Sequence, residues 1–209
     1  FMFDGLREVE TELKTLNISF HLLLGTPEVT ILQFIKDYQV GTIVSDFSPL
    51  HIYKSWKTEI NKHITIPFYE VDTHNIVPCW HASPKQEFGA YTLRPKLNRL
   101  LDKFLTEIPP IQPHNNCVAN NDIDWSKVKA SLKVNTAITP IDWCIAGTKA
   151  GKSQLTTFIT QRLSLYDTNR NGPNKQAQSD LSPYLRFGQL SAQYVAWTVK
   201  NSSLPEEAK

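Results

Sequence analysis

The chain has 209 residues, of which 41% are hydrophobic, and its formal net charge is +2 at pH 7. This apolar content is enough to form the core of one large or two small domains, whereas the small net charge carries no nucleic-acid signature of its own. No run of about 18 apolar residues occurs, so the sequence predicts no membrane-spanning helix.

Cysteine usage indicates a reducing environment. Cys79, Cys117 and Cys144 are odd in number and lack CxxC spacing, which predicts neither a disulfide framework nor a zinc cluster. We therefore expect an intracellular protein, and the sequence leaves nucleus and cytoplasm open.

The first part of the chain alternates between helical and strand-like patterns, which favours an α/β fold with a doubly wound, parallel sheet. The expected helices are 6–16, 27–38 and 49–64, and the expected strands are 18–24, 41–44 and 66–71. In the helix over 27–38, the 3.6-residue period predicts that four side chains face the core: Val29, Leu32, Phe34 and Ile35.

The usual first strand of such a sheet and its phosphate loop are missing, and no Gly-x-Gly-x-x-Gly motif occurs. A dinucleotide-dependent dehydrogenase is therefore poorly supported. We expect an exposed sheet edge, and we expect both ends of the chain to be the ends of a fragment.

The second part of the chain is predicted to be helical. A helix over 92–105 closes the first domain, and the Pro-, Asn- and Asp-rich residues 106–140 are expected to be a linker. Helices over 152–166 and 182–200 then begin a second domain.

A polar loop precedes the last of these helices. Residues 166–175 (YDTNRNGPNK) contain many turn-forming and hydrogen-bonding residues. Ser182 is expected at the N-cap with Pro183 at the first helical position, which predicts a seat for a phosphate or pyrophosphate.

Four other motifs have simpler structural interpretations. Residues 146–153 (AGTKAGKS) resemble the end of a P-loop, but Ala146 replaces the first glycine, so we expect a turn leading into a helix.

Two alternatives remain for Asp72, His74, Cys79 and His81: metal ligation and hydrogen-bonded structural roles. The aromatic side chains of Trp80, Phe88 and Tyr91 are expected to serve domain packing rather than a base-stacking platform. A solvated surface and phosphate contact remain alternatives for five cations: Lys85, Arg94, Lys96, Arg99 and Lys103.

Two segments resemble class II cyclobutane-pyrimidine-dimer photolyases. Residues 166–189, including YDTNRNGPNK and SDLSPYLRFGQ, resemble the opening of that family's FAD-binding helical domain. Residues 71–96 (VDTHNIVPCWHASPKQEFGAYTLRPK) are similar to the exit of its N-terminal α/β domain.

The resemblance implies three parts: a photolyase-type α/β domain (1–105), a linker (106–140) and the start of the all-α FAD-binding domain (141–209). It implies contacts to FAD from six residues: Tyr166, Gln178, Ser179, Asp180, Leu181 and Ser182. Gln178 and Asp180 depart from the family pattern, which more often has small or neutral residues there. The charge of Asp180 would repel a pyrophosphate unless it caps an N–H group or meets the ribose.

The activity implied is that of a deoxyribodipyrimidine photo-lyase, a carbon-carbon lyase that repairs UV-damaged DNA with light. Reduced FAD donates the electron, a deazaflavin-type antenna pigment can bind the α/β domain, and the full-length protein is expected to be a monomer. The isolated chain is expected to be inactive, with no catalytic residue of its own. A cryptochrome-like photoreceptor and a non-catalytic α/β interaction module remain alternatives.

Overall fold

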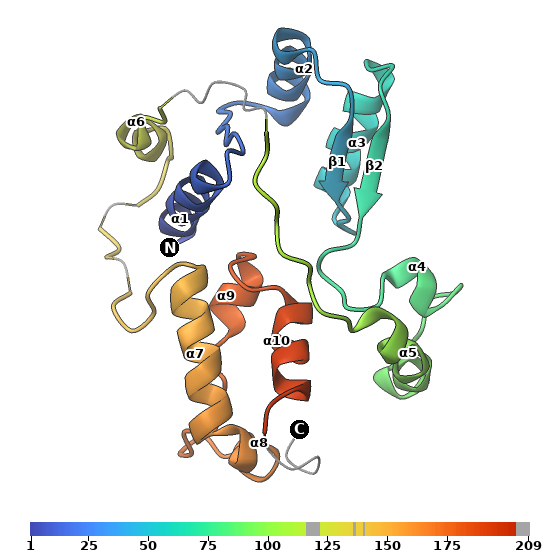
Figure 1. The fold of residues 1–209 in the computed structure, drawn as a ribbon, viewed down its shortest axis with the longest axis vertical. Helices are drawn as coiled ribbons and strands as arrows, with labels where there is room; N and C mark the ends of the chain where they lie inside the picture. The colour runs from blue at the N-terminus through green and yellow to red at the C-terminus, as the bar shows by residue number, and fades with distance from the viewer. Residues whose placement is uncertain (116–121, 136, 140, 204–209) are drawn as a thin grey trace.

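The computed structural model describes residues 1–115, 122–135, 137–139 and 141–203. It shows a mostly helical α/β protein with a small parallel sheet (Figure 1). The sheet lies with α2 and α3 at the top of the figure, and a bundle of α7, α8, α9 and α10 lies at the bottom. The helices are α1 (Met2–Thr15), α2 (Pro27–Tyr38), α3 (His51–Lys62), α4 (Cys79–Ala82), α5 (Ala90–Phe104), α6 (Trp125–Ala130), α7 (Thr148–Gln161), α8 (Leu163–Asn169), α9 (Ser182–Arg186) and α10 (Ala192–Lys200).

The sheet consists of two parallel strands, β1 (Ile43–Asp46) and β2 (Phe68–Val71), in the register Ile43 to Phe68. The helix α3 connects them, as parallel strands require a crossover. Lys57 of α3 fixes this unit, because its Nζ donates to the Asp46 carbonyl oxygen at 2.6 Å and pairs with the Glu70 carboxylate. The helix is thereby tied to the carboxyl ends of both strands.

The strand predicted over 18–24 is wrong for this structure, because the segment has no regular secondary structure and does not join the described sheet. A strand needs a neighbour for its backbone N–H and C=O groups, and the described sheet contains only β1 and β2. The buried face predicted for α2 is also partly wrong, since Val29 is 63% exposed. Leu32, Phe34 and Ile35 are half-buried.

Three predicted helices in this part are confirmed with shifted ends. The helix α1 starts before residue 6, α3 spans less than 49–64, and α5 runs from 90 to 104 where 92–105 was predicted. Pro95 lies inside α5. The predicted linker 106–140 holds a short helix, α6, which the sequence analysis did not anticipate. Asp124 caps it, since its Oδ1 accepts from the backbone N–H groups of Ser126 and Lys127, both at 3.0 Å. Part of this linker, with Cys117, lies outside the described residues.

The largest buried cluster lies in the helical unit. Leu155 and Phe158 of α7 pack there with side chains from α8, α9 and the flanking loops; the remaining members are Cys144, Leu163, Leu181, Tyr184 and Leu190. The cluster joins segments up to 46 positions apart in sequence, from Cys144 to Leu190. This core therefore positions the loop before α9.

Both helices predicted for this unit are broken in the structure. The predicted helix 152–166 divides at Arg162, whose φ of −127° ends α7 before α8 begins. The predicted helix 182–200 divides after Arg186, because Gly188 adopts a left-handed φ of 67° and Ser191 caps the new helix α10 by accepting from the Tyr194 N–H. Left-handed glycine is a common helix stop.

The helix α1 docks on the helical unit, although it comes first in the sequence (Figure 1). Its Glu8 carboxylate accepts from the Lys149 N–H at 3.0 Å, and the Phe1 ring lies 5.8 Å from the ring of Tyr184. Gly147 makes the approach possible, because a Cβ at this position would lie 1.9 Å from Glu8 Oε2.

In the described part of the chain, no helix is long and apolar enough to cross a bilayer.

We predict that Gly147→Ala destabilises the chain. Gly147 has a φ of 113°, and the new Cβ would displace Glu8 from α7, so we expect a loss of about 2–3 kcal/mol in the free energy of unfolding. Urea denaturation followed by circular dichroism measures it. The matched control is Gly41→Ala, which meets nothing within 4 Å; equal losses in both variants would contradict the prediction.

Candidate functional site

The predicted site residues come together at one end of the helical unit. Leu181 is 2% exposed and belongs to the buried cluster, while Tyr166 of α8 is half-buried. The Tyr166 ring packs edge-on against the Phe158 ring, with centroids 5.5 Å apart. The core therefore fixes the positions of both residues, and the turn before α9 lies on it.

Arg162 holds this turn in place. Its Nη1 donates to the Gln178 carbonyl oxygen at 3.0 Å and to Asp180 Oδ2 at 2.6 Å. Asp180 has a left-handed φ of 57°, a conformation that Asp and Asn tolerate better than most residues. The ion pair also offsets the negative charge that the sequence placed beside an expected phosphate seat.

Two glutamine side chains complete the turn. Gln154 Nε2 donates to the Ser179 carbonyl oxygen at 3.0 Å, and the side-chain amide of Gln178 donates to the Arg170 carbonyl oxygen. The roles of Arg162 and Gln154 were missed from the sequence, because both residues lie outside the loop motif, Gln154 on α7 and Arg162 at its end, and no spacing rule marks them.

Ser182 is exposed and opens α9, but it is not the N-cap. Leu181 holds that position, and no side chain caps the helix. The prediction of a serine N-cap is therefore wrong by one residue, because Asp180 turns the chain one position before the expected start. Since α9 has only five residues, its macrodipole is weaker than that of the helix predicted over 182–200.

The P-loop-like residues 146–153 form the turn into α7, as the simpler interpretation expected. Gln189 Oε1 accepts from the Gly147 N–H at 2.7 Å, and Glu8 accepts from the Lys149 N–H. Protein side chains therefore already satisfy these two donors at the start of α7.

Asp72 has a structural role after β2. Its carboxylate accepts from the backbone N–H groups of His74, Asn75 and Cys79 at 3.0–3.2 Å and from the Asn75 amide. Burial acts to raise its pKa, but these hydrogen bonds outweigh it and lower the pKa of Asp72. Across the described ranges, no three His, Cys, Asp or Glu side chains come together as metal ligands.

The expected domain packing of aromatic side chains holds in part for Trp80, whose ring lies 5.7 Å from the Phe47 ring while its side chain is 48% exposed. For Phe88 and Tyr91 it is wrong in this chain, because both are almost fully exposed. Beside them, Lys96 Nζ lies 2.5 Å from Glu87 Oε1 and 3.0 Å from Ser83 Oγ. Hydrogen bonds from Lys96 and Ser83 lower the pKa of Glu87 to about 2.

A cavity of about 540 Å³ lies along β1 and beyond its carboxyl end. Asp46, Phe47 and Ser48 line it from the strand end, and Arg186 of α9 reaches it from the helical unit. Trp56 and Tyr53 of α3 add aromatic surface, and His74 adds a further polar side chain. Lys57 also lines the cavity, but its ammonium is paired with Glu70. This combination suits a planar ligand with acidic groups.

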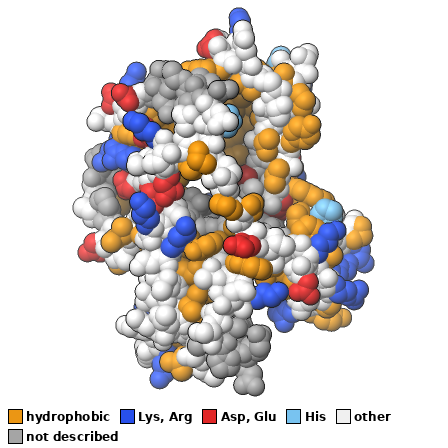
Figure 2. Space-filling view, in the orientation of Figure 1, with side chains coloured by type: hydrophobic (Ala, Val, Ile, Leu, Met, Phe, Trp, Pro, Cys, Tyr) orange, Lys and Arg blue, Asp and Glu red, His pale blue; other side chains and the backbone are white. Residues whose placement is uncertain are grey.

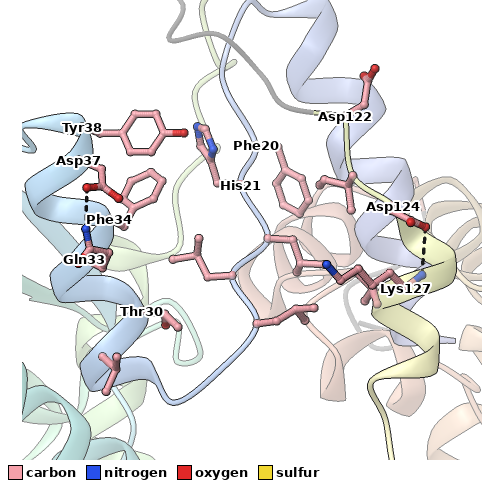
Figure 3. Close-up of a pocket in the computed structure, with 16 residues that line it drawn as sticks. Phe20, His21, Thr30, Gln33, Phe34, Asp37, Tyr38, Asp122, Asp124 and Lys127 are labelled. Atoms are coloured by element: carbon pink, nitrogen blue, oxygen red, sulfur yellow. Dashed lines mark hydrogen bonds between the residues drawn. The ribbon is translucent and has the colours of Figure 1, made fainter.

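A second cavity, of about 650 Å³, lies between the 18–24 segment, α2 and α6 (Figure 3). His21 packs on Phe34 and Tyr38, with centroids 5.0 and 5.1 Å away. The carboxylate of Asp37 accepts from Gln33, and that of Asp124 caps α6. Most of the side chains that line the cavity are apolar. The two carboxylates of Asp37 and Asp124 are already engaged in hydrogen bonds.

Comparison with known proteins identifies the family. The family model described as DNA photolyase matches residues 1–114. A deoxyribodipyrimidine photo-lyase of Potorous tridactylus is 43% identical over 92% of this chain, and one of Arabidopsis thaliana is 38% identical over 94%. The chain belongs to the DNA photolyase family.

The chain spans only 37% of the length of the Potorous relative and 42% of the Arabidopsis one. Among solved structures, a Synechocystis cryptochrome matches 98% of this chain and 45% of its own, with a TM-score of 0.70 at 15% identity. A class III photolyase of Agrobacterium tumefaciens matches with a TM-score of 0.63 at 18% identity. At these identities the structural matches show the shared fold alone.

We predict that Asp72→Ala destabilises the chain by about 2–3 kcal/mol, because three partly buried backbone N–H groups lose a charged acceptor. Asp102→Ala, which removes an exposed carboxylate, is the control and should change the free energy of unfolding by less than about 0.5 kcal/mol. Urea denaturation at neutral pH measures both. Equal stability of the two variants would show that the Asp72 hydrogen bonds do not matter.

We also predict a pH-dependent contribution from Glu87. Because folding lowers the pKa of Glu87 from 4.5 to about 2, its stabilising effect is complete above the unfolded pKa and is lost as the pH falls toward the folded one. The difference in unfolding free energy between the wild type and Glu87→Gln should therefore shrink from about pH 6 to about pH 3. A difference that stays constant over this range would contradict the assignment.

Proposed function

We propose that the full-length protein carrying this chain is a class II deoxyribodipyrimidine photo-lyase, which repairs cyclobutane pyrimidine dimers in DNA with light. The observation that carries this proposal is the 43% identity to a deoxyribodipyrimidine photo-lyase over 92% of the chain. A match of that extent includes residues of both the α/β part and the helical unit. The class II motifs at 71–96 and 166–189 support the finer assignment.

FAD is the cofactor that this proposal requires, and when bound and reduced it supplies the electron that splits the dimer. The residues proposed to contact it are Tyr166, Gln178, Ser179, Asp180, Leu181 and Ser182. The turn before α9 suits a polar ligand, because Ser182 is exposed and Arg162 compensates the charge of Asp180. Leu181 and Tyr166 anchor this part of the chain to the core.

These residues position the cofactor and do not react. Arg162 keeps the turn in one conformation, so that its backbone groups face the ligand without rearrangement. The described helices α7–α10 form one wall of the proposed site. Residues 1–105, 106–140 and 141–209 are proposed as the α/β domain, the linker and the first part of the FAD-binding domain.

We further propose that an antenna pigment of the deazaflavin type binds the cavity at the carboxyl end of β1. Ligands of doubly wound α/β domains lie beyond the carboxyl ends of the strands, and this cavity has that position. Its aromatic side chains suit a planar ring system, and Arg186 suits an acidic substituent.

The test of the function is repair by the full-length protein of a duplex oligonucleotide that contains one thymine dimer. We expect the dimer to be lost under blue light and retained in darkness. The 209-residue chain alone is expected to give no repair. Flavin binding without repair in light would favour a photoreceptor, and neither flavin nor damaged-DNA binding would favour an interaction module.

We predict that Arg162→Ala weakens flavin retention in the full-length protein. Without its guanidinium, Asp180 is left unpaired beside the ligand and the turn loses two hydrogen bonds, so the affinity should fall roughly tenfold or more. Flavin absorbance after gel filtration measures the effect. Lys175→Ala removes a cation from the same loop and should retain flavin; equal retention by Arg162→Ala would contradict the role assigned to Arg162.

A further inference from the structure

Two aromatic side chains near the start of α5 stand in solvent. Phe88 is 96% exposed and Tyr91 is 85% exposed, whereas Leu93 and Leu97 of the same helix are half-buried. The helix thus turns its leucines inward and holds Tyr91 on its outer face. Exposing two neighbouring aromatic rings costs free energy, and such rings are typical of a binding surface.

Cations occur in the same segment as these rings. Figure 2 shows Lys and Arg side chains gathered over α5 with apolar side chains beside them. Arg94 lies three positions after Tyr91 and is its neighbour on the helix surface. Arg99 lies eight positions after Tyr91, roughly 12 Å further along the helix axis. Lys85 precedes Phe88 in the loop from α4, and all three cations are exposed.

The acidic residues of this segment do not cancel the charge of these cations. Glu87 pairs with Lys96 at 2.5 Å, and Asp102 lies 3.4 Å from Lys200 Nζ. Within the described residues, Lys85, Arg94 and Arg99 form no ion pair. Three positive charges therefore remain available to an anionic partner.

We propose that Lys85, Phe88, Tyr91, Arg94 and Arg99, which we call the α5 face, bind the DNA substrate. The cations contact backbone phosphates and the two rings pack against bases or sugars. Charge complementarity favours DNA, because it offers phosphates to the three unpaired cations and bases to the two rings. This inference rests on the proposed function, which supplies DNA as the partner.

The test compares binding of a fluorescein-labelled duplex with one thymine dimer by the full-length protein and its variants. The triple variant Lys85→Gln, Arg94→Gln, Arg99→Gln should bind roughly tenfold or more weakly. Its plot of log affinity against log salt concentration should be shallower by about 2 to 3, one unit of charge for each lost phosphate contact. The matched control Lys14→Gln, Lys36→Gln, Lys54→Gln removes three exposed lysines from α1, α2 and α3 and should behave as the wild type.

The double variant Phe88→Ser, Tyr91→Ser tests the rings. It should weaken binding by roughly tenfold while leaving the salt slope unchanged, because stacking releases no counterions. Melting temperatures equal to that of the wild type establish that each variant is folded.

The possible outcomes separate this inference from the proposed function. If the wild type repairs dimers and the α5-face variants bind as tightly as the control, the α5 face is not a DNA contact while the photo-lyase assignment stands. If the wild type neither binds nor repairs damaged DNA, both proposals fail. Loss of melting temperature in the aromatic variant, without loss of affinity, would assign the rings to protein packing and overturn this inference.

Discussion

The arrangement of the chain depends on the junction at the start of α7. Gly147 has no side chain, so the Glu8 carboxylate of α1 reaches the Lys149 N–H, and Gln189 accepts from Gly147 itself. One negative side chain at a helix start is favourable because it meets free N–H groups and the positive end of the helix dipole. The junction joins the first helix of the sequence to the helical unit, although more than 130 residues separate them.

The candidate site is built from the opposite end of the same helix. The helix α7 ends at Arg162, where the change of direction into α8 leaves a guanidinium free to hold the turn before α9. Phe158, one turn earlier, anchors Tyr166. The residues proposed to contact the flavin therefore owe their positions to α7 and to the buried cluster around Leu155, since α9 itself is too short to define them.

The sequence predicted the parts of the fold that local pattern controls. The helices near 27–38 and 92–105 and the parallel strands near 43 and 68 follow from periodicity, and the 166–189 motif marked the residues that the structure brings together. The strand at 18–24 failed because strand pairing depends on neighbours that no local pattern reveals. The roles of Arg162 and Glu8 were missed for a similar reason: each acts through a contact made by the tertiary fold. Tyr91 was assigned to packing because sequence alone does not show which face of a helix remains uncovered.

The wavelength dependence of dimer repair by the full-length protein tests the central claim most directly. If this chain is part of a flavin-dependent photo-lyase, the rate of repair should follow the absorption of the bound reduced flavin, together with that of any bound antenna pigment, and should vanish in darkness. Repair that proceeds equally in darkness, or a flavin-loaded protein that leaves the dimer intact at every absorbed wavelength, would contradict it.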